Sequence, residues 1–115
     1  MEIMVTDLTR EDVVNILSTA LYGSYFFQVD NTTKNYKEAK GECIEDKLAD
    51  CLMNKKEVII NDVEEDESYT LTLHKLKMGV TKYINDGGNA NIDDWDYNDA
   101  DCVLQIALFG EVIYA

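Results

Sequence analysis

The spacing of hydrophobic residues predicts four helices along the chain. In the first, Thr9 is a suitable N-cap and Gly23 a C-terminal stop. The apolar face between them repeats every three to four residues and consists of Val13, Ile16, Leu17, Ala20 and Leu21. Residues 30–41 are polar and indicate a loop or a weak helix. The second helix is expected near 42–54, with an inward face of Ile44, Leu48, Cys51 and Leu52.

The third helix begins and ends at similar signals. Thr72 is its expected N-cap, and Gly87 and Gly88 end it, so that the helix runs over 73–86. Its apolar face consists of Leu73, Leu76, Val80, Tyr83 and Ile84.

The fourth helix is expected to start near Asn98 or Asp99 and to stop at Gly110. Gln105 is almost the only polar residue in its body. A helix that is apolar on all sides is normally buried, so we expect this helix in the core. The apolar run Val112–Tyr114 that follows it predicts an edge strand.

Two short runs rich in β-branched and aromatic residues, Val58–Ile60 and Tyr69–Leu71, flank the polar stretch Asp62–Glu67. This pattern predicts a β-hairpin with an acidic tip. The aromatic stretch Tyr25–Val29 indicates a short strand or an anchored loop.

Together these elements predict an α+β fold with about four helices and a small antiparallel β-hairpin or sheet. The length of 115 residues fits a single domain over residues 1–115, and the absence of proline leaves no mark of a linker. Disordered acidic chains are poor in aromatic residues, whereas this chain has seven Tyr, three Phe and one Trp. We therefore expect it to be folded along most of its length.

The formal net charge is −13, and this charge restricts the class of partner more than any other feature of the composition. Residues 1–56 hold ten acids and seven bases, but residues 57–115 hold thirteen acids and only three bases. Such a balance disfavours nucleic acid or an anionic membrane as a direct partner and favours a basic protein surface. The acidic N-terminus has no signal-peptide core, and three cysteines do not form a disulfide framework, so we expect a cytoplasmic protein.

Few residues in the sequence suggest metal binding or catalysis. The segment rich in Asp and Asn over 89–101 fails the EF-hand pattern: a loop that starts at Asp94 places Asp99 where glycine is required and Gln105 where the bidentate carboxylate is required. We expect that these side chains make turns and cap the next helix, although weak cation binding stays open.

Neither zinc nor a catalytic nucleophile has a recognisable pattern. The cysteines lack the short spacing of structural zinc sites, and Cys51 and Cys102 fit buried apolar positions better. The single histidine, His74, is expected on an exposed helix surface. We therefore predict no cofactor, no metal and no enzyme activity.

Three blocks of the chain carry a family resemblance: Leu8–Val14 with Ala20–Gly23, Glu65–Leu73 with Gly87–Gly88, and Asp99–Val103 with Ala107–Ala115. In these blocks the chain resembles an uncharacterised family of small acidic proteins encoded by phages and integrative elements of Gram-positive gut bacteria. The similarity covers most of the chain and is least over residues 30–56. The resemblance implies no activity and no site residue, only the setting of a mobile element inside a bacterial cell.

Two acidic segments remain as the candidate partner-binding site. We expect them to face water together, and their residues are Glu64, Glu65, Asp66, Glu67, Asp93, Asp94, Trp95, Asp96, Tyr97, Asp99 and Asp101. Trp and Tyr are typical interface anchors, and flanking carboxylates steer a basic partner. The alternatives are that the charge only keeps the protein in solution and that Trp95 packs into the core.

The function we expect joins this charge to the mobile-element setting. The carboxylates would stand in for phosphates and occupy the nucleic-acid groove of a host defence protein, such as a restriction or CRISPR effector. The alternative is a small structural or regulatory homo-oligomeric module of the element that acts through apolar surface. The sequence leaves the oligomeric state and the identity of the partner open.

Overall fold

The computed structural model describes residues 4–5 and 7–114, which form five α-helices, one 3-10 turn and a three-stranded sheet. In chain order the elements are α1 (Arg10–Tyr22), β1 (Phe27–Val29), α2 (Lys34–Glu38), α3 (Ile44–Met53), β2 (Val58–Asp62), β3 (Glu67–Leu71), α4 (Leu73–Asn85), η1 (Ile92–Asp94) and α5 (Tyr97–Phe109). The predicted α+β class is confirmed, and the segment 30–41 contains the short helix α2.

Side-chain caps decide where the long helices begin. The Thr9 hydroxyl accepts from the Asp12 amide, and the Asp12 carboxylate accepts from the Thr9 amide, which completes a capping box at α1. Thr72 caps α4 as predicted. The start of α5 lies slightly earlier than expected, because Asp96 and Asp99 form a second capping box there.

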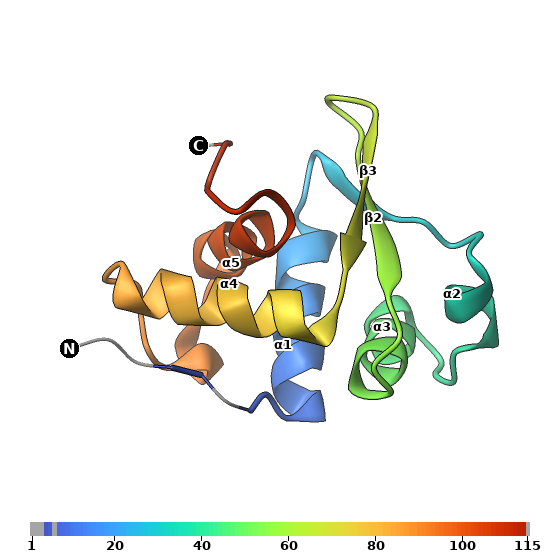
Figure 1. The fold of residues 1–115 in the computed structure, drawn as a ribbon, viewed down its shortest axis with the longest axis horizontal. Helices are drawn as coiled ribbons and strands as arrows, with labels where there is room; N and C mark the ends of the chain where they lie inside the picture. Colours follow the sequence, from blue (N-terminus) through green and yellow to red (C-terminus); the bar gives the residue numbers. More distant parts are fainter. Residues whose placement is uncertain (1–3, 6, 115) are drawn as a thin grey trace.

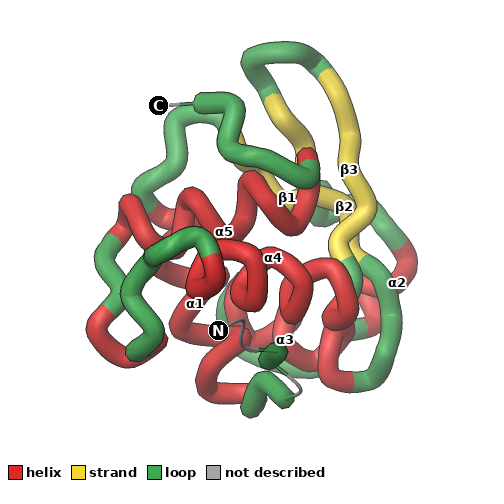
Figure 2. Tube along the Cα trace, turned by 60° about the vertical axis from the view of Figure 1, so that its left-hand side comes forward, coloured by secondary structure: helices red, strands yellow, loops and turns green. Residues whose placement is uncertain are grey.

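The sheet is antiparallel in the order β1-β2-β3, so the predicted hairpin is confirmed and the aromatic stretch supplies a third strand. Asp62 is the last residue of β2 and pairs with Phe27 on one side and Glu67 on the other. The predicted edge strand at Val112–Tyr114 is wrong, since these residues form no strand, and the amides of Ile113 and Tyr114 donate instead to the side chain of Gln105. Figure 2 shows this C-terminal segment as loop beyond α5.

Helix α1 lies at the centre of the fold and packs against both α3 and α5, and α4 covers α5 (Figure 1). The buried face of α1 is the predicted one, with Leu21 only partly buried. On α4, Leu76 and Val80 are buried as predicted and the other three predicted residues are partly buried, but Gly79 and Thr81, which were not predicted, are buried as well. On α3, Leu48, Cys51 and Leu52 are buried, but Ile44 is 41% exposed, so its predicted inward position is wrong. Ile44 is the first residue of α3, where the helix borders an open cavity instead of the core.

Gly79 sets the close approach of α4 to α5. A Cβ atom at this position would lie 2.7 Å from the carbonyl oxygen of Val103 and 3.2 Å from the Cβ of Ala107. The first distance is well inside van der Waals contact, and the atom in the way belongs to the backbone. The helix crossing therefore requires glycine, although glycine in a helix interior costs about 1 kcal/mol relative to alanine.

Candidate functional site

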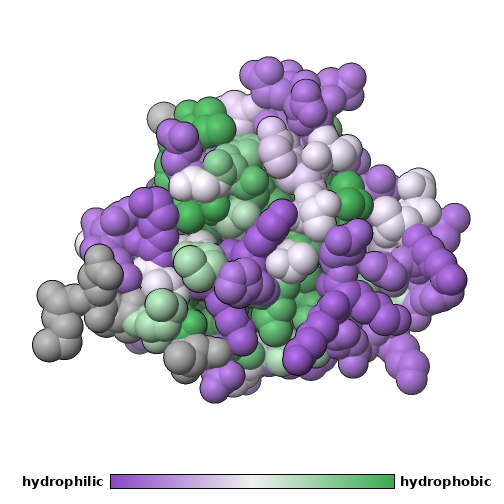
Figure 3. Space-filling view, viewed as in Figure 1, coloured by the Kyte–Doolittle hydropathy of each residue, from purple (hydrophilic) through white to green (hydrophobic). Residues whose placement is uncertain are grey.

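The first acidic segment is the turn of the β2–β3 hairpin, which stands clear of the rest of the chain at the top of Figure 1. Its acids Glu64, Glu65, Asp66 and Glu67 are all exposed. Figure 3 shows the same turn as a hydrophilic projection. Among the described residues the ion pairs are Arg10–Asp46, Lys34–Glu38 and Lys82–Asp86, so no lysine or arginine neutralises the hairpin turn.

A buried carboxylate below the turn fixes its shape. Asp62 is only 1% exposed, and its Oδ1 accepts from the backbone amides of Glu64 and Glu65, at 3.0 and 3.4 Å. Its other oxygen accepts from the Tyr114 hydroxyl at 2.6 Å, and the Tyr114 ring packs on Phe26 with ring centroids 4.4 Å apart. The hydrogen bond to Asp62 raises the pKa of Tyr114, so the hydroxyl remains a donor at neutral pH. The C-terminal segment thus braces the acidic turn.

Replacing Tyr114 with phenylalanine tests this brace. The change removes one hydrogen bond to a carboxylate and keeps the ring, so we expect the free energy of unfolding to fall by about 1–2 kcal/mol. Urea denaturation measures this loss. Tyr25→Phe is the matched control, because Tyr25 is 91% exposed and its change should stay within about 0.5 kcal/mol. Equal effects of the two substitutions would contradict the bracing role of Tyr114.

The aromatic residues of the second acidic segment belong to the fold. Trp95 is only 9% exposed, and its indole N–H donates to the carbonyl of Asn89 at 2.7 Å. Its ring meets Tyr83 edge-on, with centroids 5.5 Å apart. Tyr97 is half-buried against Gly23. The alternative in which Trp95 packs into the core and pins the loop is therefore confirmed, and Trp95 is not available as an exposed anchor.

Most carboxylates of this second segment also have partners within the chain. Asp96 and Asp99 cap α5, and Asp99 also accepts from the Tyr83 hydroxyl. Asp94 accepts from the Asn91 side chain at 3.0 Å. Asp101 is buried and accepts from the amide of Gln105 at 2.7 Å, and burial raises the pKa of Asp101. Among the described residues of this segment, Asp93 is the one exposed acid whose carboxylate accepts no hydrogen bond from the chain. The expected turn-making and capping roles are confirmed.

The two acidic segments do not form one patch. Figures 1 and 2 place the hairpin turn at the top of the molecule and the segment between α4 and α5 low on its left side. The physical reason is that η1 packs against α1, whereas the hairpin turn extends from the end of the sheet. Only Glu64–Glu67 remain as a compact, exposed group of acids, and we call these four residues the acidic tip.

Sequence reasoning missed Asp62 as the organiser of the acidic tip. An aspartate at the first position of a turn often accepts from the backbone two residues further on, so the turn pattern contained a usable signal. Nothing in the sequence pointed to Tyr114, because its contact with Asp62 joins residues 52 positions apart.

The residues considered for metal binding or catalysis are not brought together by the fold. Within residues 4–5 and 7–114, no group of three or more His, Cys, Asp and Glu side chains is arranged to hold a metal ion. Cys51 is buried as expected, Cys102 is only half-buried, and neither forms a disulfide. His74 is exposed on α4. None of the described helices combines the length and apolar character that a membrane crossing requires.

No protein-family model matches the chain, no curated protein is significantly similar to it, and no solved structure significantly matches its fold. The resemblance to proteins of phages and integrative elements therefore stays a prediction from the sequence.

Proposed function

We propose that this protein acts by binding a basic macromolecular surface and that the acidic tip makes the contact. One observation carries the proposal: four adjacent exposed carboxylates have no basic partner in the described part of the chain. Uncompensated charge of this kind costs stability through repulsion, and it accelerates association with a surface of opposite sign.

The support of the tip by Asp62 and Tyr114 adds to this proposal. A turn held in one shape loses little conformational entropy on binding, so more of the charge interaction remains as affinity. In the mobile-element setting that the resemblance implies, the partner would be a cytoplasmic, nucleic-acid-binding host protein such as a restriction or CRISPR effector. The tip would then pair with the lysine and arginine side chains that normally contact phosphates.

The proposal is narrower than full mimicry of a nucleic acid. A mimic of a long duplex needs rows of exposed carboxylates. In the second acidic segment, however, carboxylates cap α5 or accept buried hydrogen bonds within the chain. We propose insertion of a single projecting tip into a basic groove. No catalytic step is part of this function.

Affinity capture from a lysate of the bacterium that carries the gene tests the proposal. The immobilised protein should retain a basic protein at low salt and release it as the salt concentration rises, because exposed charge pairs are screened over about 8–10 Å at physiological ionic strength. Retention of a partner with no salt dependence would contradict a charge-based contact.

A homo-oligomeric module is the second candidate, and exposed apolar side chains favour it. Val112 and Ile113 near the C-terminus are 45% and 58% exposed. Light scattering coupled to size exclusion separates the two candidates. A stable dimer that survives the change of all four tip acids to lysine would favour the module, and a monomer would favour the tip.

A further inference from the structure

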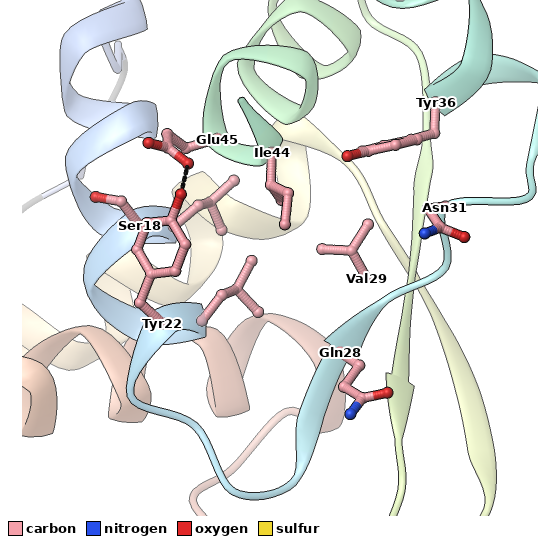
Figure 4. A pocket seen from close by; sticks show the side chains of 10 residues that line it. Ser18, Tyr22, Gln28, Val29, Asn31, Tyr36, Ile44 and Glu45 are labelled. Carbon is pink, nitrogen blue, oxygen red and sulfur yellow. Dashed lines mark hydrogen bonds between the residues drawn. The ribbon is translucent and has the colours of Figure 1, made fainter. Parts of the chain in front are cut away.

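A cavity of about 330 Å³ lies between the C-terminal half of α1, strand β1, helix α2 and the start of α3 (Figure 4). Leu17, Leu21, Val29 and Ile44 supply its apolar walls. The volume is at the lower end of the range for small-molecule pockets, which is roughly 300–1,000 Å³. The cavity also accounts for the exposure of Ile44, whose side chain forms part of the wall.

One polar side chain in this wall lacks a partner. Tyr36 is only 9% exposed, and in Figure 4 its hydroxyl points from α2 toward Ile44 across the cavity. Among the described residues nothing hydrogen-bonds to this hydroxyl. The hydroxyls of Tyr22, Tyr83 and Tyr114 differ, because each donates to a carboxylate. The ring of Tyr36 is buried, but its hydroxyl oxygen stays accessible from the open cavity, so a ligand there can hydrogen-bond to it.

The charge at the cavity is negative. Glu45 lines it and accepts a hydrogen bond from the Tyr22 hydroxyl, which ties α1 to α3 at one side of the cavity. This bond lowers the pKa of Glu45 and raises the pKa of Tyr22 to about 12, so the carboxylate is ionised at neutral pH. No lysine or arginine is among the residues that line the cavity; Lys47 lies over the Tyr36 ring, 5.2 Å from its centroid.

We propose that this cavity binds a small organic amine whose aromatic ring carries an N–H group. The ring would lie against Leu21, Val29 and Ile44, the protonated amino group would face Glu45, and the Tyr36 hydroxyl would accept a hydrogen bond from the ring. An anion is excluded by Glu45 and by the net charge of −13. The proposal does not depend on the function of the hairpin, because no residue of the acidic tip lines the cavity.

Three probes that share an indole ring but differ in charge test this site: tryptamine is cationic, indole neutral and indole-3-acetate anionic. Each is titrated into ¹⁵N-labelled protein and followed by amide chemical shifts. We expect tryptamine to shift the amides of Leu21, Val29 and Ile44. Indole should bind the same amides about tenfold more weakly, since a charge-assisted hydrogen bond is lost. Indole-3-acetate should cause no shift there.

Two substitutions separate the two polar contacts. Glu45→Gln should weaken tryptamine to the level of indole and leave indole unchanged. Tyr36→Phe should weaken tryptamine and indole by the same factor, about threefold to tenfold, because it removes a hydrogen bond to the shared ring. Tyr25→Phe is the control, since Tyr25 does not line the cavity. The dispersion of the amide spectrum shows for each variant that the fold is kept.

Three outcomes would overturn the proposal. Tryptamine could shift no cavity amide, indole-3-acetate could bind as tightly as tryptamine, or the affinity for tryptamine could be the same in wild type, Glu45→Gln and Tyr36→Phe. Partner capture through the acidic tip is measured in a separate experiment, so a negative result for the cavity does not affect the proposed function.

Discussion

Replacing Gln105 with leucine is expected to lower the free energy of unfolding by about 3 kcal/mol, because it removes four hydrogen bonds and leaves the buried Asp101 carboxylate without the donor it has there. The Gln105 side chain is fully buried in α5 and makes four hydrogen bonds. Its amide nitrogen donates to Asp101 at 2.7 Å and to the Tyr114 carbonyl at 3.1 Å. Its oxygen accepts from the amides of Ile113 and Tyr114, both at 2.8 Å. Chemical denaturation measures the loss.

The same substitution should release the C-terminal segment from α5. Hydrogen exchange at the amides of Ile113 and Tyr114 should become fast, because glutamine is their acceptor. Leu104→Met serves as the control: it changes a buried neighbour on the same helix at nearly constant volume and should cost less than about 1.5 kcal/mol. Unchanged protection of both amides in Gln105→Leu would contradict the anchoring role.

Replacing Gly79 with valine is expected to cost about 3 kcal/mol or more, because α4 and α5 touch at this residue. The side chain would meet the carbonyl oxygen of Val103, which moves only if the backbone of α5 moves. Gly79→Ala should cost less, since the higher helix propensity of alanine offsets about 1 kcal/mol of the clash. Thermal and urea denaturation of both variants give the order wild type, alanine, valine.

Met78 provides the control for valine in the same helix. It is 48% exposed, so Met78→Val should cost only the difference in helix propensity, about 0.5 kcal/mol. If Gly79→Val were no more destabilising than Met78→Val, the close crossing of α4 and α5 would be wrong.

The helices and the hairpin could be predicted because their signals lie within a few residues along the chain. Thr9 and Thr72 cap helices because their hydroxyls satisfy free amides within three residues. The same local rule explains the position of Asp96 at the start of α5, where sequence reasoning placed the start one or two residues too late. Signals of this range depend little on the rest of the chain.

The failures concern contacts between distant parts of the chain. Val112–Tyr114 has strand-like composition, but the buried Gln105 side chain already accepts from the amides of Ile113 and Tyr114, so no strand forms. The sequence shows Gln105 as a polar residue in an apolar helix, but it does not show that Gln105 bonds to Asp101, Ile113 and Tyr114. Gly79 carries no local sign of its role, because the clash that excludes a side chain comes from α5.

The candidate site was only partly predictable. The exposed acids of the hairpin turn follow from the hairpin itself, whereas the role of each acid in the second segment depends on a partner such as Tyr83 or Gln105. The cavity beside Tyr36 had no sequence signal at all, since its walls come from four separate elements.

Two variants of equal net charge, compared in the salt-gradient capture, test whether the acidic tip makes the contact. In one, the acidic tip is neutralised by Glu64→Gln, Glu65→Gln, Asp66→Asn and Glu67→Gln. In the matched control, four other exposed acids are neutralised by Asp7→Asn, Glu11→Gln, Glu42→Gln and Glu57→Gln. Each variant loses four of the charges that make up the net −13.

If the acidic tip makes the contact, the control should retain the partner and release it near the wild-type salt concentration, while the tip variant retains none. Equal weakening of both variants would show that only overall charge matters. Wild-type retention by the tip variant would contradict the proposal that these four carboxylates bind the partner.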